Sequence, residues 1–131
     1  MTWRDLEQGN PELAADGAAR LLRKPAYLAT VRADGSPRVH PTTPIIGGGR
    51  LFLFMEPTSP KGRDLDRDAR YALHSGVDDN SGGGGEFYVR GTGRRIQDAE
   101  SRALAVQSAS YKPADRYVLF EFDVDEAGAT E

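Results

Sequence analysis

The residues best suited to chemistry in this sequence lie in one short stretch, residues 55–65, which contains Ser59, Lys61 and Arg63. A hydroxyl and two cations at this spacing can hold a phosphate group, because hydrogen bonds between charged partners are the strongest that side chains make. Backbone N–H groups at the start of a helix add to such a site. The plainer alternative is a solvated helix start with an incidental lysine and arginine, and the pattern alone leaves both open.

The elements around this stretch predict how it is positioned. The apolar run 51–54 predicts a strand over residues 50–55, which ends in a Pro/Thr/Ser turn. Ser59 suits the N-cap of the helix that follows, and Pro60 suits its first position, where a missing N–H costs nothing. A lysine in the first turn is disfavoured by the helix dipole unless an anion shares the site. The turn between strand and helix is therefore the predicted anion site.

A second unusual feature is the proline content of the strand that precedes this one. Residues 26–33 alternate as a strand does, and Asp34-Gly35 is a strong signal for a hairpin turn. The returning strand, 37–46, has prolines at 37, 41 and 44, which cannot donate hydrogen bonds to a neighbouring strand. We expect missing ladder hydrogen bonds, a bulge, or a sheet edge that faces a ligand.

The rest of the pattern predicts a small antiparallel barrel with few helices. Further strands are expected over residues 69–75, 86–96 and 116–124, and helices over residues 11–22 and 99–109. The glycine-rich residues 76–85 are expected to form a flexible loop. We divide the chain into a helical segment (1–25), the barrel (26–125) and a tail (126–131).

Composition narrows the class of protein. The 131 residues suggest one domain, and the absence of cysteine excludes disulfides and thiolate chemistry. A net charge of −3 gives no reason to expect a nucleic-acid partner. No apolar run approaches the ~20 residues of a membrane span, and no His/carboxylate spacing suggests a metal site. We expect a cytoplasmic protein without a membrane partner.

Three stretches together resemble the pyridoxamine 5′-phosphate oxidase-like family, whose members are flavin-binding split β-barrel proteins. They are the hairpin over residues 28–41, the stretch 51–65, and residues 70–74 followed by 87–91. The resemblance covers nearly all of residues 26–124. It implies a mainly β (α+β) fold, a six-stranded antiparallel split β-barrel with short flanking helices. It also implies a homodimer with two cofactors at the subunit interface.

The resemblance further implies which residues bind the cofactor. The phosphate is expected on Ser59 and Lys61, with Arg63 as a further contact. The second strand is expected along the edge of the flavin ring, and the end of the third strand over the ring or ribityl chain. These residues are Arg38, Val39, His40, Pro41 and Thr42, then Met55, Glu56 and Thr58. Pro60 stands where the oxidases have an arginine, which makes the chain more similar to relatives that use the deazaflavin coenzyme F-420.

Two functional interpretations follow. The first is an oxidoreductase that transfers hydride between FMN, or alternatively deazaflavin coenzyme F-420, and a small organic substrate. The second is a non-catalytic binder or carrier of flavin, haem or bilin, because relatives bind haem or bilins on the same barrel. His40, beside the expected ring edge, either hydrogen-bonds the cofactor or donates a proton, or it serves the structure alone. No other catalytic residue is assigned.

Overall fold

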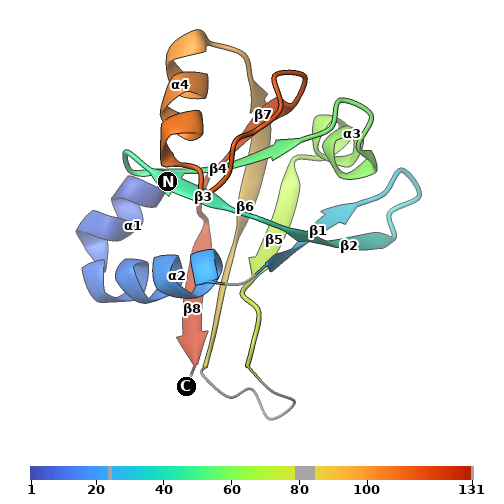
Figure 1. Cartoon of the computed structure of the whole chain (residues 1–131). Helices are drawn as coiled ribbons and strands as arrows, with labels where there is room; N and C mark the ends of the chain where they lie inside the picture. Colours follow the sequence, from blue (N-terminus) through green and yellow to red (C-terminus); the bar gives the residue numbers. More distant parts are fainter. Residues whose placement is uncertain (24, 79–84, 131) are drawn as a thin grey trace.

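A computed structural model describes residues 1–23, 25–78 and 85–130 of the chain. These residues form a curled antiparallel sheet with helices around it (Figure 1). The helices are α1 (Trp3–Gly9), α2 (Pro11–Arg23), α3 (Pro60–Arg67) and α4 (Ala99–Ser108). The strands are β1 (Ala26–Val31), β2 (Pro37–Thr42), β3 (Ile45–Gly47), β4 (Arg50–Met55), β5 (Arg70–His74), β6 (Glu86–Ile96), β7 (Val118–Phe122) and β8 (Glu126–Thr130). The expected mainly β class with short flanking helices is confirmed, although the described part has eight strands instead of six.

The strand order is β2-β1-β5-β6-β7-β4-β3, with β8 paired to β6 off this path. The long strand β6 changes partner along its length: residues 86–90 pair with β8, and residues 93–96 pair with β7. The change falls at Gly91 and Gly93. A Cβ at Gly91 would lie 2.4 Å from the Asp123 carbonyl oxygen, so only glycine allows this close approach. Gly91 and Gly93 thus lie where β6 passes from one partner strand to the next.

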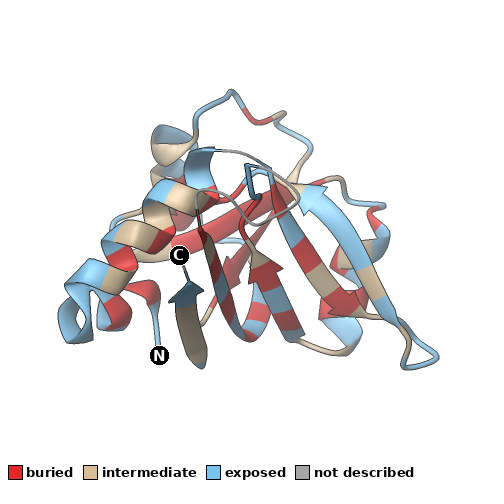
Figure 2. Ribbon diagram, turned by 90° about the horizontal axis from the view of Figure 1, so that it is seen from below, coloured by how far each residue is buried: buried red, intermediate tan, exposed pale blue. Residues whose placement is uncertain are grey.

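The predicted second strand, 37–46, is two strands that lie at opposite ends of the sheet. Among the described strands β2 pairs with β1 alone, and β3 pairs with β4. The break falls at Thr43 and Pro44, because Pro44 has no N–H with which to continue a ladder. Of the alternatives for the proline-rich strand, a sheet edge is correct, and Figure 2 shows that β2 is exposed along most of its length.

The prediction of a tail over residues 126–131 is wrong for residues 126–130. Residues Glu126–Thr130 form β8, which pairs antiparallel with residues 86–90 of β6. The sequence Glu-Ala-Gly-Ala-Thr lacks the apolar alternation that predicts a strand. The strand forms because the first half of β6 offers a free edge, and because Tyr88 and Arg90 both hydrogen-bond the Glu126 carboxylate.

The larger apolar core includes residues of the sheet and of the N-terminal helices, and a smaller one packs Ala105 of α4 against the other side of the sheet. Trp3 is 1% exposed, and its ring meets that of Phe87 edge-on with 6.1 Å between centroids. Asn10 precedes α2, and its side-chain Oδ1 accepts a hydrogen bond of 3.2 Å from the Leu13 N–H in the first turn of that helix. None of the helices in the described part of the chain is long and apolar enough to cross a membrane. Most of the glycine-rich loop expected over 76–85 falls on residues 79–84, outside the described residues.

Candidate functional site

The predicted anion site lies where β4 leads into α3. The turn is closed by a hydrogen bond from the Ser59 N–H to the Glu56 carbonyl, 3.0 Å, and Pro60 is the first residue of the helix. Ser59 occupies the N-cap with extended backbone angles, as predicted, but its side chain makes no capping hydrogen bond. The buried Ser59 hydroxyl instead accepts a hydrogen bond of 3.1 Å from Lys61 Nζ. The Ser59 hydroxyl therefore hydrogen-bonds Lys61 and does not cap the helix.

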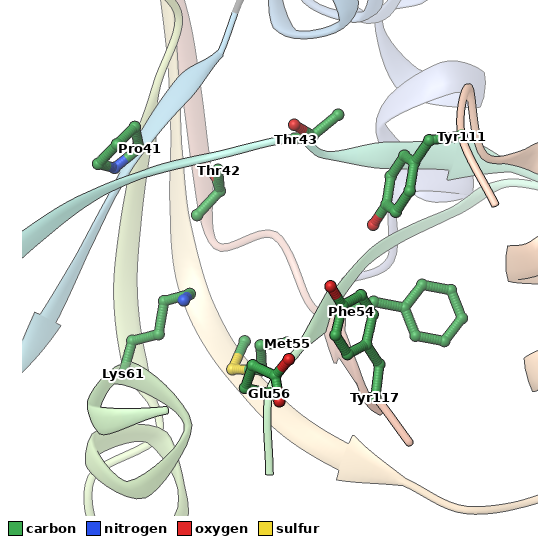
Figure 3. A pocket seen from close by; sticks show the side chains of 9 residues that line it. All are labelled: Pro41, Thr42, Thr43, Phe54, Met55, Glu56, Lys61, Tyr111 and Tyr117. Atoms are coloured by element: carbon green, nitrogen blue, oxygen red, sulfur yellow. The ribbon is translucent and has the colours of Figure 1, made fainter. Parts of the chain in front are cut away.

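Lys61 is the central cation of the site. Its side chain extends from α3 toward Thr42 on the opposite wall (Figure 3). Burial lowers the pKa of Lys61 from its ordinary value. Within residues 1–23, 25–78 and 85–130, no carboxylate lies within ion-pair distance of its ammonium group. The structure thus places a half-buried, unneutralised cation between two pockets.

The first of these, the aromatic pocket, has a volume of about 320 Å³. Figure 3 shows Lys61 on one side and the hydroxyl ends of Tyr111 and Tyr117 pointing into the space on the other. Burial raises the pKa of Tyr111, so its hydroxyl stays protonated at neutral pH and can donate a hydrogen bond. The full lining is Pro41, Thr42, Thr43, Phe54, Met55, Glu56, Lys61, Tyr111 and Tyr117.

The second, the lysine pocket, has a volume of about 190 Å³ and shares Lys61 with the first. Its lining is Arg32, Arg38, Val39, His40, Ser59, Pro60 and Lys61. Partial desolvation, followed by the positive charges of Lys61 and Arg38, lowers the pKa of His40 below its ordinary value of 6.5. His40 is therefore a neutral imidazole at neutral pH, able to donate or accept a hydrogen bond.

Arg38 is held in place by the buried carboxylate of Asp64. Asp64 is 2% exposed and accepts hydrogen bonds from Arg38 Nε at 2.7 Å, Thr30 Oγ1 at 2.8 Å and Arg67 Nη2 at 3.0 Å. Burial acts to raise its pKa, but the hydrogen bonds from Arg38, Thr30 and Arg67 outweigh burial and leave the pKa below 3.8. This network ties β1, β2 and α3 together and fixes one wall of the lysine pocket.

Nine of the eleven residues predicted to bind a cofactor line these two pockets. The aromatic pocket is lined by five of them: Pro41, Thr42, Met55, Glu56 and Lys61. The lysine pocket is lined by Arg38, Val39, His40, Ser59 and, again, Lys61. Thr58 lies in the exposed turn outside both pockets, and Arg63 lines a neighbouring cavity. The Glu56 carboxylate is bonded to the Arg116 guanidinium, with Nε at 3.0 Å.

The sequence analysis missed several lining residues, above all Arg32, Tyr111 and Tyr117. Strand alternation places Arg32 on the same face of the hairpin as Thr30, and this signal was available in the sequence. The two tyrosines carry no comparable local signal. Tyr111 follows α4 in a loop and Tyr117 precedes β7, so only the folded sheet brings them beside β4.

The fold is similar to those of known structures. A conserved hypothetical protein from Mycobacterium tuberculosis superposes with a TM-score of 0.72 at 16% identity, covering 92% of this chain and 82% of that one. A haem-binding protein from Mycobacterium smegmatis superposes with a TM-score of 0.64 at 18% identity. The match covers 88% of this chain and 57% of that one. HutZ, the haem storage protein of Vibrio cholerae, superposes with a TM-score of 0.63 at 14% identity, and the match covers 92% of each chain. At these identities the similarity establishes the fold.

Sequence comparison identifies the family. A search of curated proteins gave no match. The family model described as pyridoxamine 5′-phosphate oxidase matches residues 17–131, which include the whole sheet, α3 and both pockets. The expected resemblance is therefore confirmed, and this chain belongs to the pyridoxamine 5′-phosphate oxidase family.

Proposed function

We propose that the protein binds a flavin-type cofactor, with the cofactor phosphate on Lys61 and Ser59, and that it acts as an oxidoreductase. In this proposal hydride passes between FMN, or alternatively deazaflavin coenzyme F-420, and a small organic substrate. The observation that carries the proposal is the half-buried ammonium of Lys61, which has no carboxylate partner in the described part of the chain.

A half-buried cation without a counter-ion is costly, because burial removes hydration that nothing replaces. A phosphate dianion bound at this position offsets that cost through charge-assisted hydrogen bonds. Ser59 supplies a buried hydroxyl beside the ammonium, and the N–H groups of the first turn of α3 are not capped by the Ser59 side chain. These donors fit a phosphate better than they fit a neutral group.

The aromatic pocket supports placement of the ring. Tyr111, Tyr117 and Met55 offer apolar surface, while the tyrosine hydroxyls and Thr42 can hydrogen-bond ring heteroatoms. A bound flavin supplies the hydride chemistry itself. The role of this chain is then to bind the phosphate through Lys61, to orient the ring, and to present the neutral imidazole of His40 as a hydrogen-bond partner.

We also propose that a second copy of the chain completes the site. The outer face of the β1–β2 hairpin is apolar and open: Val39 is 65% exposed and Tyr27 48% exposed, beside Pro41 and Ala29. This face adjoins the lysine pocket, which includes Val39. At about 320 and 190 Å³, each of the two pockets is small for enclosing a whole flavin-type cofactor, so a partner subunit at this face would supply a further wall of the site.

A second candidate is haem binding without catalysis. Two structures of similar fold are a haem-binding and a haem storage protein by name. In this chain His40 is the imidazole available to a metal, since it is neutral and exposed. His74 is occupied, with Nδ1 2.6 Å from the Ser75 carbonyl oxygen and Nε2 3.4 Å from the Glu86 carboxylate.

Parallel titrations of the apo-protein with FMN, riboflavin, the deazaflavin coenzyme and haemin test both candidates. The flavin proposal expects quenching of flavin fluorescence on binding, with FMN or the deazaflavin bound more tightly than riboflavin. If the protein binds haemin but none of the flavins, and the shift of the haem Soret band is lost in His40→Asn, the haem candidate would replace the flavin proposal. Equal affinity for FMN and riboflavin would show that Lys61 does not bind the cofactor phosphate.

A further inference from the structure

One wall of the aromatic pocket is a loop that contains neither helix nor strand. It is the α4–β7 loop, residues 109–117, which contributes Tyr111 and Tyr117 to the lining. The hydroxyl ends of both tyrosines point into the pocket (Figure 3). Because Tyr111 is 37% exposed, the packing around its ring is incomplete. The shape of this wall therefore depends on what fixes the backbone of the loop.

Arg102 on α4 fixes that backbone. Its guanidinium donates to three carbonyl oxygens of the loop: Nη1 to Tyr117 at 2.7 Å, and Nη2 to Asp115 at 3.0 Å and to Ala114 at 3.4 Å. The Ala114 oxygen also accepts the Tyr117 N–H at 3.0 Å, which closes a turn over residues 114–117. Carbonyl groups that are shielded from water need hydrogen-bond donors. The planar fork of an arginine can reach several of them at once.

The same guanidinium also contacts the pocket through a ring. Its carbon Cζ lies 5.1 Å from the centre of the Phe54 ring, and Phe54 lines the aromatic pocket. A cation–π contact of this kind holds the guanidinium against β4. Arg102 thus joins α4, β4 and the α4–β7 loop. Two of the residues that it contacts, Phe54 and Tyr117, are pocket residues, although the lining of the pocket does not include Arg102 itself.

We propose that Arg102 is a positioning residue, which holds the α4–β7 loop as a wall of the aromatic pocket and thereby sets the affinity for the aromatic ring of the ligand. The inference rests on the proposed function for the placement of the ring in this pocket. It adds that the site has two halves that mutations can separate. Lys61 determines the affinity for the phosphate, and Arg102 determines the affinity for the ring.

A second contact, at the rim of the pocket, holds the loop less firmly. Arg116 lies over the Tyr117 ring, 5.2 Å from its centre, and is bonded to the Glu56 carboxylate. The side chains of Arg116 and Glu56 are 65% and 43% exposed, and exposed ion pairs contribute little to stability. The hydrogen bonds from Arg102 to Tyr117 and Ala114 are partly buried, and a shielded carbonyl that loses its donor costs more. The loop is therefore held mainly from the side of α4.

Binding of riboflavin and FMN to the full chain separates the two halves, because only FMN carries the phosphate. Arg102→Gln should weaken the binding of both about three- to tenfold, since displaced tyrosines lose part of their contact with the ring. The ratio of the two affinities should change less than twofold. Lys61→Ala has the opposite signature, because it lowers the preference for FMN and leaves riboflavin affinity unchanged. Fluorescence titration measures these affinities.

A spectroscopic measurement on the apo-protein tests the position of the loop directly. The protein is labelled with carbon-13 in its tyrosine rings, and the signals of Tyr111 and Tyr117 are assigned through Tyr111→Phe and Tyr117→Phe. Both signals should shift in Arg102→Gln. The signal of Tyr71 is the internal reference and should stay in place, because this tyrosine is buried and its hydroxyl donates to the Asp123 carbonyl oxygen at 2.7 Å.

Arg95→Gln is the matched control. Arg95 lies over the Phe120 ring at the same 5.1 Å, but its guanidinium hydrogen-bonds the Asp66 carboxylate, so flavin affinity should not change. Arg102→Lys is the second variant and replaces Arg102→Gln as the test if that variant does not fold. Lysine keeps the charge but carries its donors on one atom, which cannot reach all three carbonyls, so riboflavin affinity should fall here too.

The inference is overturned if riboflavin binds to Arg102→Gln as tightly as to Arg95→Gln, or if Arg102→Lys binds riboflavin as the wild type does. It is also overturned if the signals of Tyr111 and Tyr117 stay in place. Failure of the proposed function has a different signature, because the wild type would then bind neither the flavins nor the deazaflavin. The tyrosine signals of the apo-protein would still decide whether Arg102 holds the loop.

Discussion

Lys61 Nζ donates a hydrogen bond of 3.1 Å to Oγ of Ser59, the N-cap residue of the same helix. This contact turns the serine hydroxyl away from the backbone that it would ordinarily cap. The helix start is left with uncapped N–H groups beside an ammonium, an arrangement that disfavours the apo-protein and favours an anion.

Lys61→Ala should weaken FMN binding about ten- to a hundredfold, because one charge-assisted hydrogen bond to a phosphate is worth roughly 1.5–3 kcal/mol. The apo-protein should unfold at an equal or higher temperature, since a half-buried cation at a helix N-terminus is removed. Fluorescence titration and thermal unfolding measure the two effects.

Riboflavin is the control for that prediction because it lacks the phosphate, and its affinity should not change in Lys61→Ala. Lys112→Ala, which removes an exposed lysine outside both pockets, should leave FMN affinity unaltered. An equal loss of affinity for FMN and riboflavin in Lys61→Ala would contradict the phosphate assignment.

Ser59→Ala should cost less stability than an ordinary N-cap substitution, which costs about 1 kcal/mol. The reason is that the Ser59 hydroxyl makes no capping hydrogen bond to be lost. FMN affinity should fall, though less than in Lys61→Ala. Asp98→Ala is the comparison, because the Asp98 side chain does cap α4 through the Ser101 N–H at 2.9 Å. Chemical denaturation should therefore show the larger loss for Asp98→Ala; the reverse order would mean that Ser59 caps α3 in solution.

Asp64→Asn should destabilise the protein by about 1–3 kcal/mol at pH 7, because Arg38, Arg67 and Thr30 lose a buried charged acceptor. The pKa of Asp64 is below its ordinary 3.8 in the folded protein, so its contribution is present above that pH and is lost as the pH falls through the folded-state pKa. The stability difference between wild type and Asp64→Asn should therefore shrink on acidification below about 3.8. Urea unfolding at pH 7 and pH 3 measures it, and a difference that stays constant would contradict the network.

His40→Asn should stabilise the apo-protein at pH 5 and have no effect at pH 8. Folding lowers the pKa of His40 below 6.5, through desolvation and the charges of Lys61 and Arg38. The unfolded chain therefore takes up a proton first, and this penalty grows as the pH falls below 6.5 and is complete below the folded-state pKa. Thermal unfolding of wild type and His40→Asn across this pH range measures the effect. A gain of the same size at both pH values would show that the effect is not one of charge.

Light scattering should give twice the chain mass of 14.3 kDa at micromolar concentration. Val39→Asp should shift the protein toward monomer, because it puts a charge on the open apolar face of the β1–β2 hairpin. Val106→Asp on α4 is the control, since Val106 is also exposed, at 43%, but lies on another surface. A monomeric wild type, or equal dissociation by both variants, would argue against this face as the interface.

The sequence by itself determined the local elements and their order. Pro60 after Ser59 marked a helix start, Asp34-Gly35 a hairpin, and alternation the strands, because each depends on neighbours within a few residues. The three prolines of the predicted strand 37–46 signalled missing ladder hydrogen bonds, a bulge or a sheet edge, because proline has no N–H to pair with a neighbouring strand.

The tertiary structure alone decided which distant residues meet. β8 forms only because β6 has an edge to offer, and its Glu-Ala-Gly-Ala-Thr sequence carries no periodic signal. The direction of the Ser59 hydroxyl was settled by competition between the helix backbone and Lys61, which no propensity describes. Tyr111 joins the aromatic pocket from a loop far along the chain. Such contacts depend on how the sheet curls, and the pattern of a short segment does not contain that information.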